Sequence, residues 1–137
     1  MKRVAGRAII IQDDDVLLMF RRKIKDGKVF EYYGIPGGKQ EDNETLEECT
    51  IREIKEELNL DVVIDRYLGY LEDDKNISHI FNVKVIGGKL KLGGEELEHN
   101  CEENYYEIRK IKISDIDNIN LYEKNKMLIR KAYENYE

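Results

Sequence analysis

The chain has 137 residues, of which 41% are hydrophobic and 38% are charged, and its formal net charge is −6. This composition excludes a disordered or fibrous protein, and the length suits one domain over residues 1–137. The negative charge argues against a nucleic acid polymer as a partner, because phosphate polymers are bound by an excess of Lys and Arg.

The sequence also limits the compartment and the covalent chemistry. No apolar segment approaches the roughly 20 residues of a membrane-spanning helix, and the apolar stretch near the start is too short for a signal peptide. The two cysteines, Cys49 and Cys101, form no CxxC pair, which argues against a disulfide scaffold or a cysteine-rich zinc site. We therefore expect a cytoplasmic protein with no membrane partner.

The first third of the chain has the pattern of β-structure. Residues 3–11 and 16–24 are rich in Val, Ile, Leu and Phe and flank the turn sequence QDDD, which predicts a hairpin. A second turn, KDGK, precedes an extended segment that ends at Pro36 and two glycines. We expect these segments to lie side by side in one sheet.

A helix is predicted from about Glu44 to Leu58. Apolar or small residues recur at intervals of four, and one further residue widens this stripe: Leu46, Thr50, Ile54, Leu58 and, as the widening residue, Ile51. Asn43 is the expected N-cap. Asn59 is the expected C-terminal residue in a left-handed conformation, which Asn tolerates better than most residues.

The rest of the chain returns to strands before a closing helix. Residues 61–71 and 77–86 are predicted strands, followed by a long glycine-rich loop that contains one short strand at 89–92. We further expect a strand at 105–113, a turn at 114–120 and a helix at 121–136. Long loops of this kind are often functional.

Three acidic side chains share one face of the predicted helix: Glu53, Glu56 and Glu57. Like charges at these spacings destabilise a helix by roughly 0.2–0.5 kcal/mol per pair, and a hard divalent cation would reverse that effect. Mg²⁺ or Mn²⁺ is the expected cofactor, since both prefer carboxylate and water oxygens. A solvated helix face is the alternative.

Neighbouring residues could support such a site. Arg52 could pair with one of the carboxylates and aim it at the metal. Gly37 and Gly38 have no side chains, so a backbone carbonyl there could approach the ion. Among these residues, Gly37 is the predicted carbonyl ligand.

Residues 38–60 resemble the Nudix box, G-x5-E-x7-R-E-U-x-E-E-x-G-U, in which U is aliphatic. The matching positions are Gly38, Glu44, Arg52, Glu53, Ile54, Glu56, Glu57, Leu58 and Leu60. The single departure is Asn59 in place of glycine, and Asn preserves a left-handed turn there. The resemblance extends over most of the chain, because the flanking strands and the terminal helix are arranged as in that family.

The resemblance implies both a fold and a reaction. The fold is α+β, an α/β/α sandwich with a mixed central β-sheet. The reaction is hydrolysis of a nucleoside diphosphate linked to another group, with Mg²⁺ on Glu53, Glu56 and Glu57. Similar enzymes take the general base from the box, which matches Glu53, or from a distant loop, where Glu95, Glu96 and Glu98 are candidates and Glu96 is preferred.

Substrate-binding residues are expected upstream of the box. Arg21 or Arg22 could bind phosphate through its planar guanidinium, although either could be a surface arginine at a strand end. Tyr32 or Tyr33 could line a base pocket or pack in the core, and Tyr33 is preferred as a site residue together with Gly38. His79 and His99 are expected to be structural.

The substrate class remains open at this level. A nucleoside triphosphate is slightly preferred, with ADP-ribose and dinucleoside polyphosphates as alternatives, since the box does not specify the pocket. A non-catalytic nucleotide-binding module and an acidic scaffold are the alternatives from other classes. The expected partner is a small nucleotide, and the protein could be a monomer or a homodimer.

Overall fold

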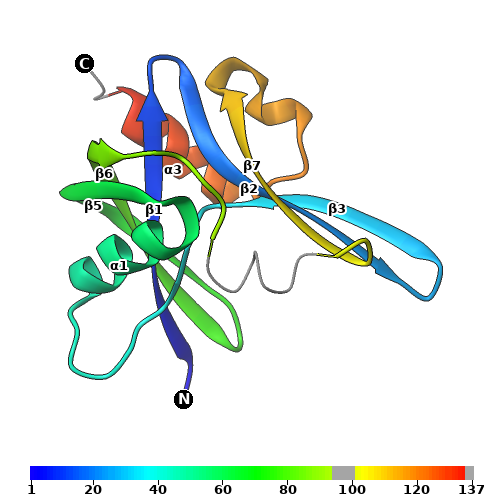
Figure 1. The fold of residues 1–137 in the computed structure, drawn as a ribbon, viewed down its shortest axis with the longest axis horizontal. Helices are drawn as coiled ribbons and strands as arrows, with labels where there is room; N and C mark the ends of the chain where they lie inside the picture. The colour runs from blue at the N-terminus through cyan, green and yellow to red at the C-terminus, as the bar shows by residue number, and fades with distance from the viewer. Residues whose placement is uncertain (94–100, 135–137) are drawn as a thin grey trace.

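The computed structural model describes residues 1–93 and 101–134, drawn in colour in Figure 1. Its elements in chain order are β1 (Arg3–Gln12), β2 (Asp15–Lys25), β3 (Lys28–Gly34), β4 (Gly37–Lys39), α1 (Leu46–Leu58), β5 (Leu60–Glu72), β6 (Asn76–Gly88), β7 (Asn104–Lys112), the 3-10 helix η1 (Ile113–Asn118) and α3 (Glu123–Glu134).

The strands of this described part form one mixed sheet. Its order is β3-β2-β1-β6-β5, with β4 paired to β1 and β7 paired to β2. The β1 and β6 strands are parallel and the other pairs are antiparallel. The expected mixed sheet is therefore confirmed.

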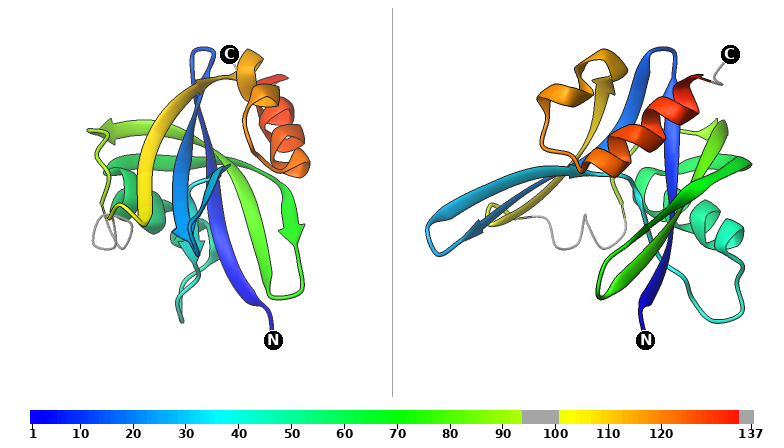
Figure 2. Two further views of the ribbon diagram at one scale, coloured as in Figure 1. Left: turned by 90° about the vertical axis from the view of Figure 1, so that its right-hand side faces the viewer. Right: turned by 180° about the vertical axis from the view of Figure 1, so that it is seen from behind.

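Helices α1 and α3 cover opposite faces of this sheet (Figure 2). On the α1 side, Ile54 and Leu58 are buried against a cluster that includes Val83. On the other side, Ile129 of α3 is buried against Ile80 and other sheet residues. Burial of apolar side chains on both faces stabilises the layers, so the predicted α/β/α sandwich is confirmed.

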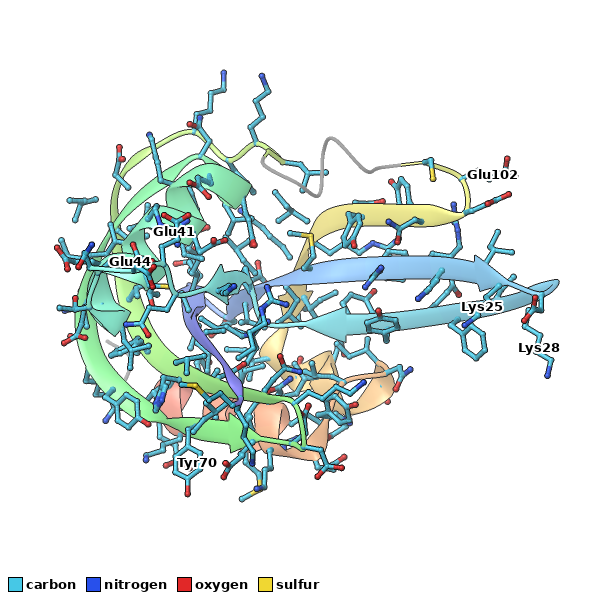
Figure 3. All side chains as sticks on the ribbon, turned by 90° about the horizontal axis from the view of Figure 1, so that it is seen from below. Lys25, Lys28, Glu41, Glu44, Tyr70 and Glu102 are labelled. Atoms are coloured by element: carbon cyan, nitrogen blue, oxygen red, sulfur yellow. The ribbon has the colours of Figure 1, made fainter. Side chains whose placement is uncertain are left out.

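Strand β1 contacts different partners along its length, and this divides the sheet. Residues 5–7 pair with β4, whereas β2 joins β1 only at Ile11 and Gln12. Strand β2 also pairs with β7 and, from Met19 onwards, with β3, and these three strands leave the body as an arm (Figure 1). Lys25 and Lys28 lie at the tip of this arm, well away from Glu41 and Glu44 (Figure 3).

The caps of α1 differ in part from the prediction. The N-cap is Thr45, not Asn43: the Thr45 hydroxyl accepts the Glu48 N–H at 3.1 Å, and the Glu48 carboxylate accepts the Thr45 N–H at 2.8 Å. This is a capping box, whose T-x-x-E signature is present in the sequence. At the other end, Asn59 is left-handed with φ of 57°, as predicted.

The short strand predicted at 89–92 is absent from the described residues, and the segment instead follows the end of α1. The N–H groups of Lys89, Lys91 and Gly93 donate to the carbonyls of residues 59, 58 and 57, at 3.1, 2.9 and 2.9 Å. The last carbonyls of a helix have no partner within the helix, so a crossing segment can bind them. The backbone N–H groups of this segment therefore bind the end of α1 and do not pair with a neighbouring strand.

Two other predictions are wrong in detail. Ile51 is 37% exposed and does not join the buried stripe of α1, because the helix presents Glu57 to the interior instead, at 4% exposed. The predicted turn at 114–120 is largely the helix η1, whose Ile113 and Ile116 are buried. Among the described residues, no helix is both long enough and apolar enough to cross a bilayer.

Candidate active site

Arg52 is the centre of an ion-pair network on the exposed side of α1. Its Nε and Nη2 donate to the two oxygens of Glu44, at 3.0 and 2.7 Å. Its Nη1 donates to Glu53 at 2.9 Å and to Glu56 at 3.1 Å, while Nη2 also reaches the Lys39 carbonyl at 3.0 Å. One guanidinium thus joins the helix to the loop before it.

This network shifts the pKa values of Glu44 and Arg52. The hydrogen bonds from Arg52 lower the pKa of Glu44 from 4.5 to about 2. The same contact raises the pKa of Arg52, so its charge is held throughout the working range of pH. Both groups therefore remain ionised at neutral pH, and the guanidinium keeps a fixed orientation beside the carboxylates.

Glu57 is held differently, because it is buried at 4% exposed. Its Oε2 accepts the backbone N–H of Gly37 at 3.2 Å. A buried carboxylate is costly unless it is hydrogen-bonded, so this contact holds the glycine loop against the helix. Glu57 therefore connects α1 with β4.

The two glycines of β4 allow this close approach. Gly37 has φ of 148°, and a Cβ there would collide with the Gly6 carbonyl of β1. A Cβ at Gly38 would collide with the carboxylate of Glu53. Glycine is needed at Gly37 because the nearest atoms there belong to the backbone of β1, whereas at Gly38 the nearest atoms are the end of the Glu53 side chain.

These residues line a hollow of about 750 Å³, which we call the acidic hollow. Its wall includes Glu53, Glu56 and Glu57. Its basic lining residues are Arg3, Arg7, Arg21, Lys39 and Arg52. Within residues 1–93 and 101–134, no three His, Cys, Asp or Glu side chains are gathered tightly enough to hold an ion as they stand.

A second hollow, of about 660 Å³, lies between the sheet and the start of α3, and we call it the aromatic hollow. Its lining includes Tyr32, Tyr33, Ile35, Leu71, Tyr122 and Asn125. Five residues line both hollows: Arg7, Arg21, Gly37, Glu57 and Tyr106. The two hollows are therefore adjoining parts of one cleft, acidic at one end and largely apolar at the other.

Arg21 and Arg22 lie on opposite faces of β2, as the alternation of a strand requires. Arg21 faces the cleft, where its Nε and Nη2 donate to Asn104 at 3.2 and 2.9 Å and its Nη1 donates to the Tyr32 hydroxyl at 3.0 Å. Arg22 instead lies over the Tyr105 ring at 4.9 Å and is not among the residues that line either hollow.

Comparison with known families agrees with this arrangement. A NUDIX domain model matches residues 1–125. The chain belongs to the Nudix hydrolase family. It is 39% identical over 95 residues to an ADP-ribose pyrophosphatase of Methanocaldococcus jannaschii, and the match covers 65% of this chain and 55% of that protein.

Solved structures with the Nudix fold resemble the chain over its whole length. A Nudix family hydrolase from Clostridium perfringens has a TM-score of 0.73 at 18% identity, covering 100% of this chain and 99% of its own. An ADP-ribose pyrophosphatase from Streptococcus suis has a TM-score of 0.68 at 20% identity, covering 100% and 96%. At these identities the likeness is one of fold.

Within this Nudix domain, Tyr33 both packs against the core and lines the aromatic hollow. Its hydroxyl accepts the Arg109 Nη1 at 2.9 Å, and its ring lies 5.2 Å from the Phe20 ring in an edge-to-face arrangement. It packs against the buried cluster on the α3 side and also lines the aromatic hollow. Tyr32 lines the same hollow.

Arg7 of β1 is a site residue that the sequence analysis missed. Its Nε donates to Ser78 at 3.1 Å, and its Nη1 donates to the carbonyls of Ile35 at 3.0 Å and Gly37 at 3.5 Å. A charged residue between apolar ones in a central strand was the available signal. Asn125 was also missed, since nothing local distinguishes it.

Three loop glutamates, two histidines and two cysteines were also considered in the sequence analysis. Glu95, Glu96, Glu98 and His99 lie outside the described residues. His79 contacts the Tyr67 hydroxyl at 2.8 Å. Cys49 is fully buried, which raises the pKa of its thiol to about 11 and leaves it unreactive at neutral pH.

Proposed function

We propose that this protein is a metal-dependent pyrophosphohydrolase that cleaves the diphosphate linkage of a nucleoside diphosphate derivative. The observation that carries the proposal is the continuous cleft, with carboxylates and arginines at one end and tyrosines at the other. A substrate with a charged diphosphate and a flat base has the same two-part character. Large apolar pockets with a few polar groups are the usual sites of such ligands.

The donor set suits a hard divalent cation. Glu53, Glu56 and Glu57 line one hollow with the backbone of Gly37. Their carboxylates are not gathered tightly enough to hold an ion as they stand, so they would turn towards Mg²⁺ or Mn²⁺ to bind it. Arg52 already neutralises Glu53 and Glu56, at 2.9 and 3.1 Å. When bound, the metal would neutralise the diphosphate and lower the pKa of a bound water.

The side chains of the cleft have separate roles in this proposal. Arg21 is held by Asn104 and Tyr32, so its guanidinium is pre-oriented to contact a phosphate oxygen. Arg52 orients the carboxylates of Glu53 and Glu56. The general base is either Glu53 or a loop glutamate, of which Glu96 is the preferred candidate, and it removes a proton from the attacking water.

ADP-ribose is the substrate that we place first. The support is the relative from Methanocaldococcus jannaschii, named as an ADP-ribose pyrophosphatase and 39% identical over 95 residues. A nucleoside triphosphate is the second candidate, because this chain matches only 55% of that relative's length. Pocket residues outside the Nudix box decide between these substrates.

The test is a hydrolysis panel with and without Mg²⁺. ADP-ribose, nucleoside triphosphates, oxidised triphosphates and dinucleoside polyphosphates are incubated with the protein, and nucleotide, phosphate and pyrophosphate products are measured. We expect metal-dependent cleavage of ADP-ribose to give AMP and ribose 5-phosphate. A folded protein that cleaves none of these compounds, while nucleotide still raises its melting temperature, would be a binding module instead.

A further inference from the structure

Asn125 is a buried polar residue in the wall of the aromatic hollow. It lies in the first turn of α3, is 5% exposed and lines the hollow together with Tyr122. Among the described residues, its Oδ1 is the buried side-chain oxygen that has no hydrogen-bond partner. Buried polar atoms in folded proteins almost always have a partner, so an unused acceptor in a pocket wall indicates a missing donor.

The neighbouring acceptors in this part of the wall already have partners. Asp73 accepts the N–H groups of Lys75 and Asn76 at 2.8 and 2.7 Å. Glu72 accepts Lys2 at 2.6 Å. Among the described residues in this part of the hollow, Asn125 is therefore the one with a buried acceptor that lacks a hydrogen-bond partner.

Tyr122 supplies a second surface for a ligand. It precedes α3, is 81% exposed and lines the same hollow as Asn125. An exposed tyrosine ring can stack on a nucleobase, and stacking depends little on which base is present. The discrimination between bases must then come from hydrogen bonding at the edge of the ring.

We propose that Asn125 and Tyr122 form a nucleobase subsite that selects adenine by its amino group. A carboxamide presents an acceptor beside a donor, and adenine presents the complementary amino group beside a ring nitrogen. Oδ1 is buried in the wall, and a turn of the carboxamide about its soft terminal torsion would bring it to a base that enters the hollow. This subsite rests on the proposed function, since it places the base of the same substrate.

The test measures binding of two product-like nucleotides to the full chain by calorimetry, with no turnover involved. The first is AMP and the second is purine riboside 5′-monophosphate, which lacks only the amino group. We expect the wild type to bind AMP about tenfold more tightly, the contribution of one hydrogen bond. In Asn125→Leu the two nucleotides should bind equally.

Met127→Ala is the control, because Met127 lies on the same helix, is 64% exposed and does not line the hollow. It should keep the preference for AMP. Equal binding of both nucleotides to the wild type would overturn the subsite, and this result does not depend on whether Asn125→Leu folds. A preference that survives in a folded Asn125→Leu protein would overturn the role of Asn125.

The two proposals fail in different ways. Hydrolysis of ADP-ribose without any preference for AMP would leave the proposed function intact and remove the adenine subsite. A preference for AMP without hydrolysis of any compound in the panel would leave the subsite intact and remove the enzymatic proposal.

Discussion

The two ends of the cleft are built in different ways. The acidic end draws Glu53, Glu56 and Glu57 from one helix, where consecutive turns bring them together. The aromatic end is lined by residues from many elements that are far apart in sequence, among them Tyr32 from β3, Leu71 from β5 and Asn125 from α3. The residues proposed to cleave the bond thus come from one short segment, whereas those of the proposed base pocket are brought together by the whole fold.

The arginines at the two ends of the cleft have different kinds of partner. At the acidic end, Arg52 donates hydrogen bonds to three carboxylates and stabilises an arrangement in which these carboxylates would otherwise repel one another. At the junction with the aromatic end, Arg21 is fixed instead by Asn104, by the Tyr32 hydroxyl and by the Tyr106 ring at 4.9 Å. An arginine without a carboxylate partner among these contacts keeps its charge available for a phosphate.

The largest expected effect is at the acidic end. Glu56→Gln removes a proposed metal ligand whose side chain is 51% exposed, so the fold should be retained. A metal contact is worth several kcal/mol in the transition state, so we expect kcat to fall by on the order of 10²–10³-fold. Steady-state hydrolysis over a range of Mg²⁺ concentrations measures this loss.

Glu47→Gln is the matched control, since Glu47 lies on the same helix and is exposed but does not line the acidic hollow. It should leave kcat unchanged. Equal activities in the two variants would mean that the acidic end is an ordinary solvated helix face, and the contrast between the two ends would lose its basis.

The second largest effect is expected at Arg21, and its neighbour on β2, Arg22, provides the comparison. Arg21→Ala should raise KM about tenfold with a smaller change in kcat, because a charge-assisted contact to the bound substrate is lost. Arg22→Ala should leave both constants near the wild-type values, since Arg22 lies over Tyr105 and away from the cleft. Initial rates over a range of substrate concentrations separate the two constants, and an equal rise in KM for both variants would contradict this assignment.

The smallest effect is on stability. Arg52 lowers the pKa of Glu44 from 4.5 to about 2, so the folded state binds fewer protons than the unfolded state between these values. The stabilisation by Glu44 should be complete above pH 4.5 and disappear as the pH falls towards 2. Urea unfolding of wild type and Glu44→Gln should show a difference of about 1 kcal/mol or less at neutral pH.

A difference between these two proteins that stayed constant from pH 7 to pH 2 would show that Glu44 contributes through packing and not through its charge. The network around Arg52 would then be less important for stability than its hydrogen bonds suggest.

Sequence reasoning found the features that depend on neighbouring residues. The helix through Glu53 and Glu57, the left-handed Asn59 and most strands could be predicted because spacing along the chain fixes them. The N-cap was missed although its signature is local, since the capping box of Thr45 and Glu48 begins two residues after the expected Asn43.

Other features required contacts between distant segments. Residues 89–93 do not form the expected strand, because the open carbonyls at the end of α1 bind their backbone N–H groups. Arg7 and Asn125 enter the cleft only because β1 and α3 border the same cavity. No pattern in either segment specifies that proximity.

The sequence by itself determined the family, the fold class and the set of acidic residues, since a long motif on one helix contains them. The tertiary structure decided which arginine of β2 faces the cleft, that Glu57 is buried against Gly37, and that Asn125 has an unused acceptor. The physical reason is range: helical periodicity acts over a few residues, whereas a cleft forms where strands and helices from the whole chain meet.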